Sequence, residues 1–218
     1  MSKLAGVIKT GRIVTVRFSQ GGKVAWVKFK KGDRVARGQA LAGLDTRPVQ
    51  IDLDRELAEY RKVRAEFDKL SREIPEAVND EQKTKKELAQ ARLEIAVKAV
   101  EKRKYELDSL NLVSPVDGIV VEDSSLVAGI WIAPSGFGVE IADLGLVVLE
   151  LNLPEKDIDK LNAKQGLVVE TAGKKILASL SFVAIVADKK GKEPTFKVQL
   201  QLLGKEEVVL GRMGTVEL

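Results

Sequence analysis

The amino-acid sequence predicts a mainly β fold that carries an α-helical hairpin: a split β-sandwich is interrupted by an antiparallel coiled-coil hairpin and is followed by a small antiparallel β-barrel. Three observations lead to this prediction. Residues 46–111 are highly charged and contain no glycine, the two flanking segments share a spacing of glycine and aspartate, and the segment after residue 145 is rich in β-forming residues. The expected domains are residues 11–45 plus 112–145 for the sandwich, 46–111 for the hairpin and 146–218 for the barrel.

The composition removes several classes of function. The chain has 218 residues, of which 44% are apolar and 31% charged, a balance typical of a globular protein. It contains neither histidine nor cysteine, which excludes Ser-His-Asp and Cys-His nucleophiles, His or Cys zinc sites and disulfides. The formal net charge is only +4, which is weak evidence for a nucleic-acid partner. No run reaches the roughly 18 apolar residues of a membrane-spanning helix.

The first half-sandwich and its partner resemble each other in their turn residues. In the first flank Gly22, Gly32, Gly38 and Asp45 follow at intervals of 10, 6 and 7 residues. In the second flank Gly118, Gly129, Gly136 and Asp143 follow at intervals of 11, 7 and 7 residues. Each flank has at most about 35 residues, which is too few for an independent core. We therefore expect the two halves to pair with each other across the insert.

The insert is expected to form two helices that pack along a seam. In the first arm apolar residues recur at steps of three and four, the spacing of a coiled coil: Leu53, Leu57, Tyr60, Val63, Phe67, Leu70 and Ile74. The second arm repeats the spacing: Ala89, Leu93, Ala96, Val100, Arg103, Leu107 and Leu110. Pro75 lies between the arms, and a proline inside a helix removes a backbone hydrogen bond. An antiparallel hairpin is therefore expected, with a solvated helix pair packed on a domain as the alternative.

The last third of the chain is expected to form the barrel. Residues 167–170, 176–183 and 196–202 are predicted strands, and the last of them alternates apolar and polar residues with period two. A short helical segment is expected over residues 154–161, because proline followed by acidic residues suits a helix N-terminus.

Several motifs in the flanks resemble a known family. Four segments resemble the first half of the lipoyl-like sandwich of periplasmic adaptor subunits, which are also called membrane fusion proteins and belong to efflux pumps and type I secretion systems. The segments are Gly22-Lys23-Val24, Lys31-Gly32-Asp33-Arg34-Val35, Gly38-Gln39-Ala40-Leu41 and Leu44-Asp45. The second half resembles Ser114-Pro115-Val116-Asp117-Gly118-Ile119-Val120, and the Gly-Met turn of the family's barrel resembles Leu210-Gly211-Arg212-Met213. The resemblance, closest to adaptors of the hemolysin-secretion type, implies a lipoyl-like β-sandwich.

The turn residues are assigned architectural roles. Gly32-Asp33 and Asp117-Gly118 are expected to supply positive-φ backbone at tight turns, and Gly38 and Gly136 are expected to do the same in the next connection. Gly129 is placed among the same structural turns. Trp26 and Trp131 are expected to be half-buried sandwich residues rather than platforms for a ligand.

The resemblance implies a protein that works by binding and is not an enzyme. The hairpin would reach an outer-membrane channel or pack beside its neighbours in a homo-oligomeric ring, and the barrel would contact an inner-membrane transporter driven by ATP or by protons. No cofactor, metal or nucleic acid is expected. The chain would act in the periplasm or on the extracytoplasmic face of the inner membrane. The candidate partner-binding residues lie at the hairpin tip: Leu70, Ser71, Arg72, Ile74, Pro75 and Val78.

The sequence departs from the family in two respects. Many members carry an Arg, a Leu four residues on and a Ser seven beyond that near the hairpin tip, but here only Arg103, Leu107 and Ser114 have this spacing, and they lie at the base. Neither the family's N-terminal anchor nor its membrane-proximal domain is evident. We therefore expect a soluble piece of a longer protein or an unusually short member.

Four alternatives to the adaptor each require different residues. A biotin or lipoate carrier has its modified lysine where this chain has residues 46–111. An enzyme would need convergent carboxylates or a Ser-Lys pair, and the acids Asp52, Asp54, Glu56 and Glu59 scatter around a helix. A nucleic-acid or acidic-lipid surface would use Lys28, Lys30, Lys31, Arg34 and Arg37, or Lys189-Lys190-Gly191-Lys192, but both clusters are small. A coiled-coil interaction module without a transport role remains open.

Overall fold

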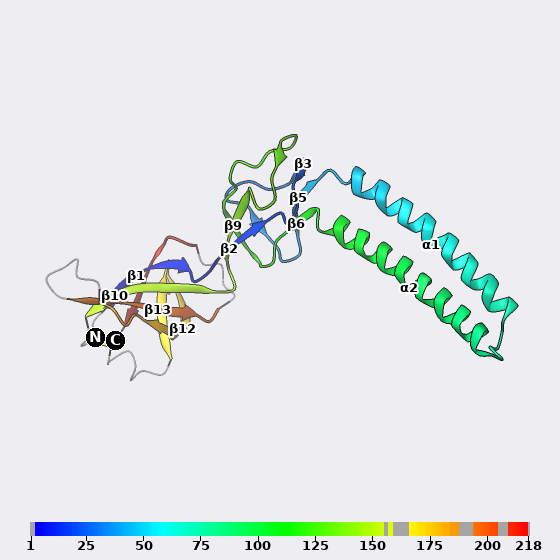
Figure 1. Ribbon diagram of the computed structural model, residues 1–218. Coiled ribbons are helices and arrows are strands. Elements are labelled where there is room, and N and C mark those ends of the chain that lie inside the picture. Colours follow the sequence, from blue (N-terminus) through cyan, green and yellow to red (C-terminus); the bar gives the residue numbers. More distant parts are fainter. Residues whose placement is uncertain (1–2, 155–156, 159–165, 188–193, 205–208, 218) are drawn as a thin grey trace.

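The computed structural model of the chain consists of three parts in a row, a β-barrel, a β-sandwich and a helical hairpin (Figure 1). It describes residues 3–154, 157–158, 166–187, 194–204 and 209–217. The chain begins and ends in the barrel, and the hairpin projects from the far side of the sandwich. The expected fold class is confirmed: the protein is mainly β, with a helical hairpin inserted in a β domain and an antiparallel barrel after it.

The barrel closes in the strand order β1-β10-β13-β12-β11-β14. Its strands are β1 (Lys3–Thr10), β10 (Val147–Pro154), β11 (Leu167–Thr171), β12 (Lys174–Val183), β13 (Thr195–Leu202) and β14 (Met213–Glu217). The expected period of two is confirmed in β13, where Val198, Leu200 and Leu202 are buried in the barrel core. Such alternation is what a strand with one buried face requires.

Two features of the barrel differ from the expectation. Strand β1 completes the barrel by pairing with β10 on one side and β14 on the other, although the sequence analysis assigned it to no domain. No local pattern indicates this, because its partners lie more than a hundred residues away. Pro154 ends strand β10 rather than opening a helix, whereas Asp157 and Ile158 are helical as expected, and the other residues of the expected segment lie outside the described residues.

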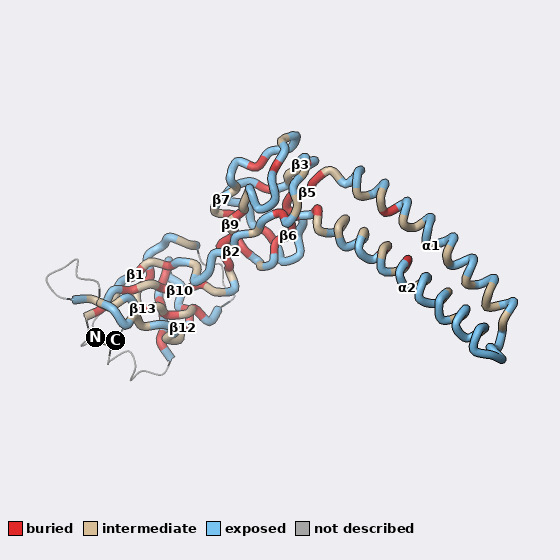
Figure 2. The backbone as a smooth tube through the Cα atoms, in the orientation of Figure 1, coloured by how far each residue is buried: buried red, intermediate tan, exposed pale blue. Residues whose placement is uncertain are grey.

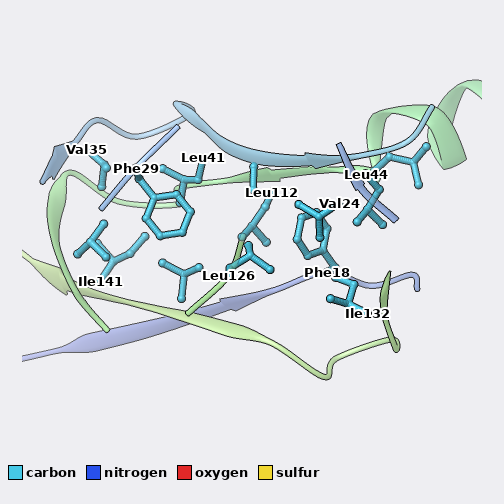
Figure 3. Close-up of a cluster of buried hydrophobic side chains, with 14 residues drawn as sticks. Phe18, Val24, Phe29, Val35, Leu41, Leu44, Leu112, Leu126, Ile132 and Ile141 are labelled. Carbon is cyan, nitrogen blue, oxygen red and sulfur yellow. The ribbon is translucent and has the colours of Figure 1, made fainter. Parts of the chain in front are cut away.

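The sandwich is built from both flanks of the hairpin. One sheet has the order β2-β9-β7-β4 and the other β6-β5-β3-β8. The strands are β2 (Ile13–Arg17), β3 (Gly22–Val27), β4 (Arg34–Val35), β5 (Ala40–Leu44), β6 (Asn111–Val113), β7 (Gly118–Glu122), β8 (Trp131–Ile132) and β9 (Gly138–Asp143). Each sheet therefore mixes strands from before and after the insert. Figure 3 shows Phe18, Leu41 and Ile141 among the buried side chains between the sheets, and each is at most 2% exposed.

The hairpin consists of α1 (Arg47–Glu73) and α2 (Asp80–Asp108), which run antiparallel. Every predicted seam residue of both arms is buried or half-buried, so the heptad pattern is confirmed. Figure 2 shows that most of the remaining hairpin surface is exposed. The connection contains Pro75 as expected, and the Asn79 side chain caps α2 by accepting a hydrogen bond of 2.9 Å from the Gln82 amide.

The expected positive-φ turns divide into two groups. Gly32, Gly38 and Gly129 have φ of +94°, +80° and +95°. The expectation is wrong for Gly118 and Gly136, which do not have positive φ. At Gly118 the reason for glycine is close packing instead: a Cβ there would lie 2.4 Å from Ile141 Cγ2 and 2.5 Å from the Ala142 carbonyl oxygen.

Gly118→Ala is expected to destabilise the sandwich by roughly 1–3 kcal/mol, because the backbone of β9 must shift to admit the methyl group. The matched control is Gly22→Ala, in strand β3, where the added Cβ would meet Leu44 at an ordinary 3.4 Å. That change should stay within about 0.5 kcal/mol. Urea unfolding followed by tryptophan fluorescence measures both variants, and equal losses would reject the packing explanation.

Candidate interaction surfaces

The hairpin tip is held in shape by hydrogen bonds to its backbone. The Ile74 amide donates to the Leu70 carbonyl at 2.9 Å, which ends α1. The Val78 amide donates to Gln82 Oε1 at 2.9 Å, and Lys86 Nζ donates to the Pro75 carbonyl at 2.7 Å. The turn between the helices is therefore fixed from both arms.

The predicted tip residues fall into two groups. Leu70, Ser71 and Ile74 are half-buried because they face the neighbouring helix along or beside the seam, whereas Arg72, Pro75 and Val78 are exposed. Arg72 Nε donates to the Asp68 carbonyl at 3.2 Å. Val78 is 88% exposed, and an apolar side chain in that position has no role in the seam. Val78 is thus a large apolar side chain that the described part of the tip leaves uncovered.

A second apolar surface lies on the flank of α2 and was missed by the sequence analysis. We name it the α2 stripe and define it by Leu88, Ala91 and Ile95. Leu88 is 53% exposed and Ile95 is 70% exposed, and Ala91 between them is also exposed. Ile95 borders a shallow hollow of about 670 Å³ on the same helix. The signal in the sequence was the heptad interval between Leu88 and Ile95, one residue ahead of the seam positions.

The outer face of α1 differs from the α2 stripe. Ala58 and Ala65, also one heptad apart, are exposed there and are surrounded by ion pairs. Three of the four candidate acids take part in ion pairs rather than gathering in a site: Asp52 with Arg55 at 3.6 Å, Glu56 with Arg55 at 3.3 Å, and Glu59 with Lys62 at 3.3 Å. The fourth, Asp54, accepts a hydrogen bond from Gln50 at 3.0 Å. Such pairs are typical of a solvent-exposed helix face and contribute little to stability.

The residues with the spacing of the docking motif are unsuited to docking. Arg103 is held by Glu106 at 2.7 Å and lies 3.9 Å from Asp52 of the other helix. Ser114 is 1% exposed, and its hydroxyl donates to the Val116 carbonyl at 2.7 Å. This spacing therefore marks the packed base of the hairpin.

The base of α1 carries a strongly paired carboxylate. Asp45 accepts hydrogen bonds from Arg47 Nε at 2.9 Å and from the Arg47 amide at 3.1 Å. The side-chain bond, followed by the backbone bond, lowers the pKa of Asp45 from 3.8 to about 2. Because the pKa is lowered on folding, the pair stabilises the fold above pH 3.8, and this contribution is lost as the pH falls towards 2.

A carboxyl NMR titration of Asp45 is expected to give a midpoint near 2, and Arg47→Ala should return it towards 3.8. Arg55→Ala is the control, because Arg55 pairs with Asp52 and Glu56 instead. A midpoint that did not respond to the loss of Arg47 would mean that the pair does not form in solution.

The basic cluster on the sandwich is partly occupied by its own neighbours. Lys28 lies 4.9 Å from the ring centre of Trp26, and Lys31 pairs with Glu122 at 3.2 Å. Trp26 is half-buried as expected, but the same expectation is wrong for Trp131, which is 77% exposed. Trp131 lies in the edge strand β8, so no further strand covers it. The second cluster, Lys189-Lys190-Gly191-Lys192, lies outside the described residues.

The described part of the chain holds neither a metal-binding cluster of acidic side chains nor a helix suited to crossing a membrane. Among those residues, no three acidic side chains come close enough together to hold a metal ion. None of the described helices combines the length and the apolar character that crossing a bilayer requires.

Comparisons with known proteins agree with this geometry. Residues 12–133, more than half of the chain, match the barrel-sandwich hybrid domain of RND membrane fusion proteins. None of the curated protein sequences matches the chain. A membrane fusion protein from Streptococcus pneumoniae has a TM-score of 0.69 and 19% identity, with 100% of this chain and 98% of that chain covered.

Two further structures share the fold. A MacA-MexA chimera with the α-hairpin of Pseudomonas aeruginosa MexA has a TM-score of 0.73 and 20% identity, with 99% of this chain and 80% of that chain covered. A candidate efflux transporter from Bacteroides eggerthii has a TM-score of 0.74 and 17% identity, with 99% and 67% covered. The structural likeness and the matched domain agree: the chain belongs to the RND membrane fusion proteins, the periplasmic adaptor family of efflux systems, whose members are generally not enzymes.

Proposed function

We propose that this chain connects an inner-membrane transporter, driven by ATP or by protons, to an outer-membrane or other envelope exit duct, and that it works in the periplasm by binding and assembly. The observation that carries the proposal is the projecting hairpin. The seam residues of its two helices pack against each other, whereas Val78 at its tip is 88% exposed. A folding argument alone favours a polar residue at such a turn. The tip therefore suits contact with another protein.

The connection between the half-sandwiches favours an adaptor over a biotin or lipoate carrier. In this chain β5 leads directly into α1, and α2 leads directly into β6, so a helical hairpin occupies the turn where a carrier presents its lysine. Several lysines of this insert belong to helical ion pairs, such as Lys62 with Glu59 and Lys85 with Glu81.

Val78→Asp is expected to reduce export strongly, because docking would then bury an unpaired charge. The free energy of unfolding should change by less than about 0.5 kcal/mol, since the side chain is exposed. Ile74 is left unchanged because it is half-buried in the seam. The assay measures export by the transporter that works with this chain, with the adaptor expressed at the wild-type level.

The matched control is Val127→Asp, which places the same charge at a valine of the sandwich that is 54% exposed. Export should remain normal in this variant. Normal export by the Val78→Asp variant would show that the tip does not dock, and would move the proposed contact to the flanks of the hairpin or to the barrel.

We also propose that copies of the chain assemble side by side into a ring through the α2 stripe. Two contacts give the register of the antiparallel helices: Arg103 lies beside Asp52, and Leu70 and Ala89 line one pocket. In this register Ala65 of α1 lies, along the hairpin axis, between Leu88 and Ile95 of α2. In a ring of parallel hairpins, Leu88 and Ile95 of one copy would pack on either side of Ala65 of the next. Large residues that fit around a small one give the knobs-into-holes packing of coiled coils.

A further inference from the structure

The barrel and the sandwich are joined by two chain segments that run side by side. Strand β1 ends at Thr10 and β2 begins at Ile13. Strand β9 ends at Asp143 and β10 begins at Val147. Thr10 pairs with Val147 in the barrel, and Ile13 pairs with Ala142 in the sandwich. Both connections pass together between the two domains (Figure 1), so the junction is a two-stranded antiparallel ribbon.

An ion pair joins the two strands of this ribbon where it leaves the sandwich. Asp143 is 4% exposed, and among the described residues it is the only charged one that is buried. Its carboxylate accepts a hydrogen bond of 2.9 Å from Arg12 Nε and a second one from Arg12 Nη2. The Gly145 amide donates to the other carboxylate oxygen at 2.8 Å. Because a buried carboxylate is costly unless it is paired, Asp143 holds the Arg12 side chain in place.

No shared core spans the barrel and the sandwich in the described part of the chain. The clusters of buried apolar residues in the two domains have no residue in common. A hollow of about 660 Å³ opens beside the ribbon and is lined by Arg12, Pro115 and Leu146, among others. A ribbon of only two strands twists over a wider range than a larger sheet does. The contacts inside the ribbon, rather than a packed interface, therefore determine the angle between the domains.

We infer that Arg12 and Asp143 are positioning residues that set the angle between the barrel and the sandwich. Two hydrogen bonds from the planar guanidinium fix the direction of one strand relative to the other, which a single charge contact cannot do. The hairpin projects from the far side of the sandwich, so the same angle determines where the hairpin tip lies relative to the barrel. The inference goes beyond the proposed function, because it concerns the chain itself and requires neither a transporter nor an exit duct.

The test measures the distance between two spin labels, one in each domain. The chain has no cysteine, so Lys23→Cys in β3 and Lys175→Cys in β12 place the labels at exposed strand positions. Double electron–electron resonance should give one narrow distance distribution. Arg12→Gln/Asp143→Asn removes both charges, so that no unpaired charge stays buried. This variant should broaden the distribution at least about twofold, because the ribbon is then free to twist.

The matched control is Lys9→Gln, which also removes an ion pair between two strands, here with Glu150 at 2.7 Å, but inside the barrel. Its distance distribution should stay as narrow as that of the wild type. Arg12→Gln alone is a second test, because the Arg12 side chain is 59% exposed and its loss removes little packing. This variant should broaden the distribution as well.

Urea unfolding followed by tryptophan fluorescence should show that the sandwich stays folded in each variant. An unchanged distribution in both Arg12 variants, or equal broadening by Lys9→Gln, would overturn the inference. Unfolding of the sandwich in both Arg12 variants would also overturn it, because the pair would then support the domain itself rather than its orientation. None of these measurements depends on export, so the inference and the proposed function can fail separately.

Discussion

Replacement of residues 46–108 by an Asn-Gly turn is expected to leave the sandwich and the barrel folded and to abolish export. The cut is possible because the two ends of the hairpin meet in the sheet: the Leu44 amide donates to the Leu110 carbonyl at 3.0 Å, and Gly43 pairs with Asn111. Asn-Gly is the preferred two-residue turn between antiparallel strands. The loss of export follows because no tip would remain to reach a partner.

Leu110 must be kept in the shortened chain. It is 3% exposed and belongs to the sandwich core, although the sequence analysis placed it in the hairpin. The same replacement with Leu110→Ala is expected to cost a further 2–5 kcal/mol or so, because a buried leucine leaves a cavity. Val49 and Leu107 pack at the edge of this core, so their removal should cost less.

The measurement is thermal unfolding of the shortened chain, followed by near-ultraviolet circular dichroism of Trp26 and Trp131. A cooperative transition shows that the two halves fold together without the helices. A shortened chain without fixed tertiary structure would mean that the hairpin is part of the folding unit, and would contradict the split-domain interpretation.

Ala65→Cys/Ile95→Cys is expected to form disulfides between copies of the chain. The wild-type chain has no cysteine, so any covalent oligomer reports on these two positions alone. The proposed ring places Ile95 of one copy beside Ala65 of the next. Within one hairpin both side chains are exposed and neither lies in the seam, so they are not expected to reach the short Cβ separation that a disulfide needs.

The control is Ala65→Cys/Lys83→Cys, whose second cysteine is also exposed on α2 but lies off the stripe. It should remain monomeric under the same oxidation. Leu88→Asp/Ile95→Asp should abolish assembly, because each contact would bury unpaired charges, whereas Lys83→Asp/Gln90→Asp should not. Equal crosslinking by both cysteine pairs would reject the stripe as the interface between copies.

The sequence predicted the hairpin and the split sandwich because their signals are local. A coiled-coil seam repeats within a single helix, so Leu53 and Val100 could be assigned to it without knowledge of their partners. The matched glycine intervals of the flanks likewise recur within short segments. These patterns determined that two half-domains are separated by a pair of helices.

Other features were decided by contacts between distant parts of the chain. Strand β1 joins the barrel through partners near residues 150 and 215, and the sequence of β1 does not indicate which strands it pairs with. Glycine at position 118 could not be explained by turn chemistry, because its cause is the backbone of β9. Trp131 is a large aromatic residue of the kind often found in a core, but it lies in an edge strand and is exposed.

The candidate surfaces show the same division. The sequence by itself determined where the hairpin turns, because a proline acts on the helix within a few residues. Only the tertiary structure decided which apolar residues remain uncovered, since Leu88 and Ile74 look alike in the sequence, but Ile74 is half-buried against the neighbouring helix and Leu88 is not covered. The physical reason is that burial belongs to a pair of surfaces, and a sequence pattern describes only one of them.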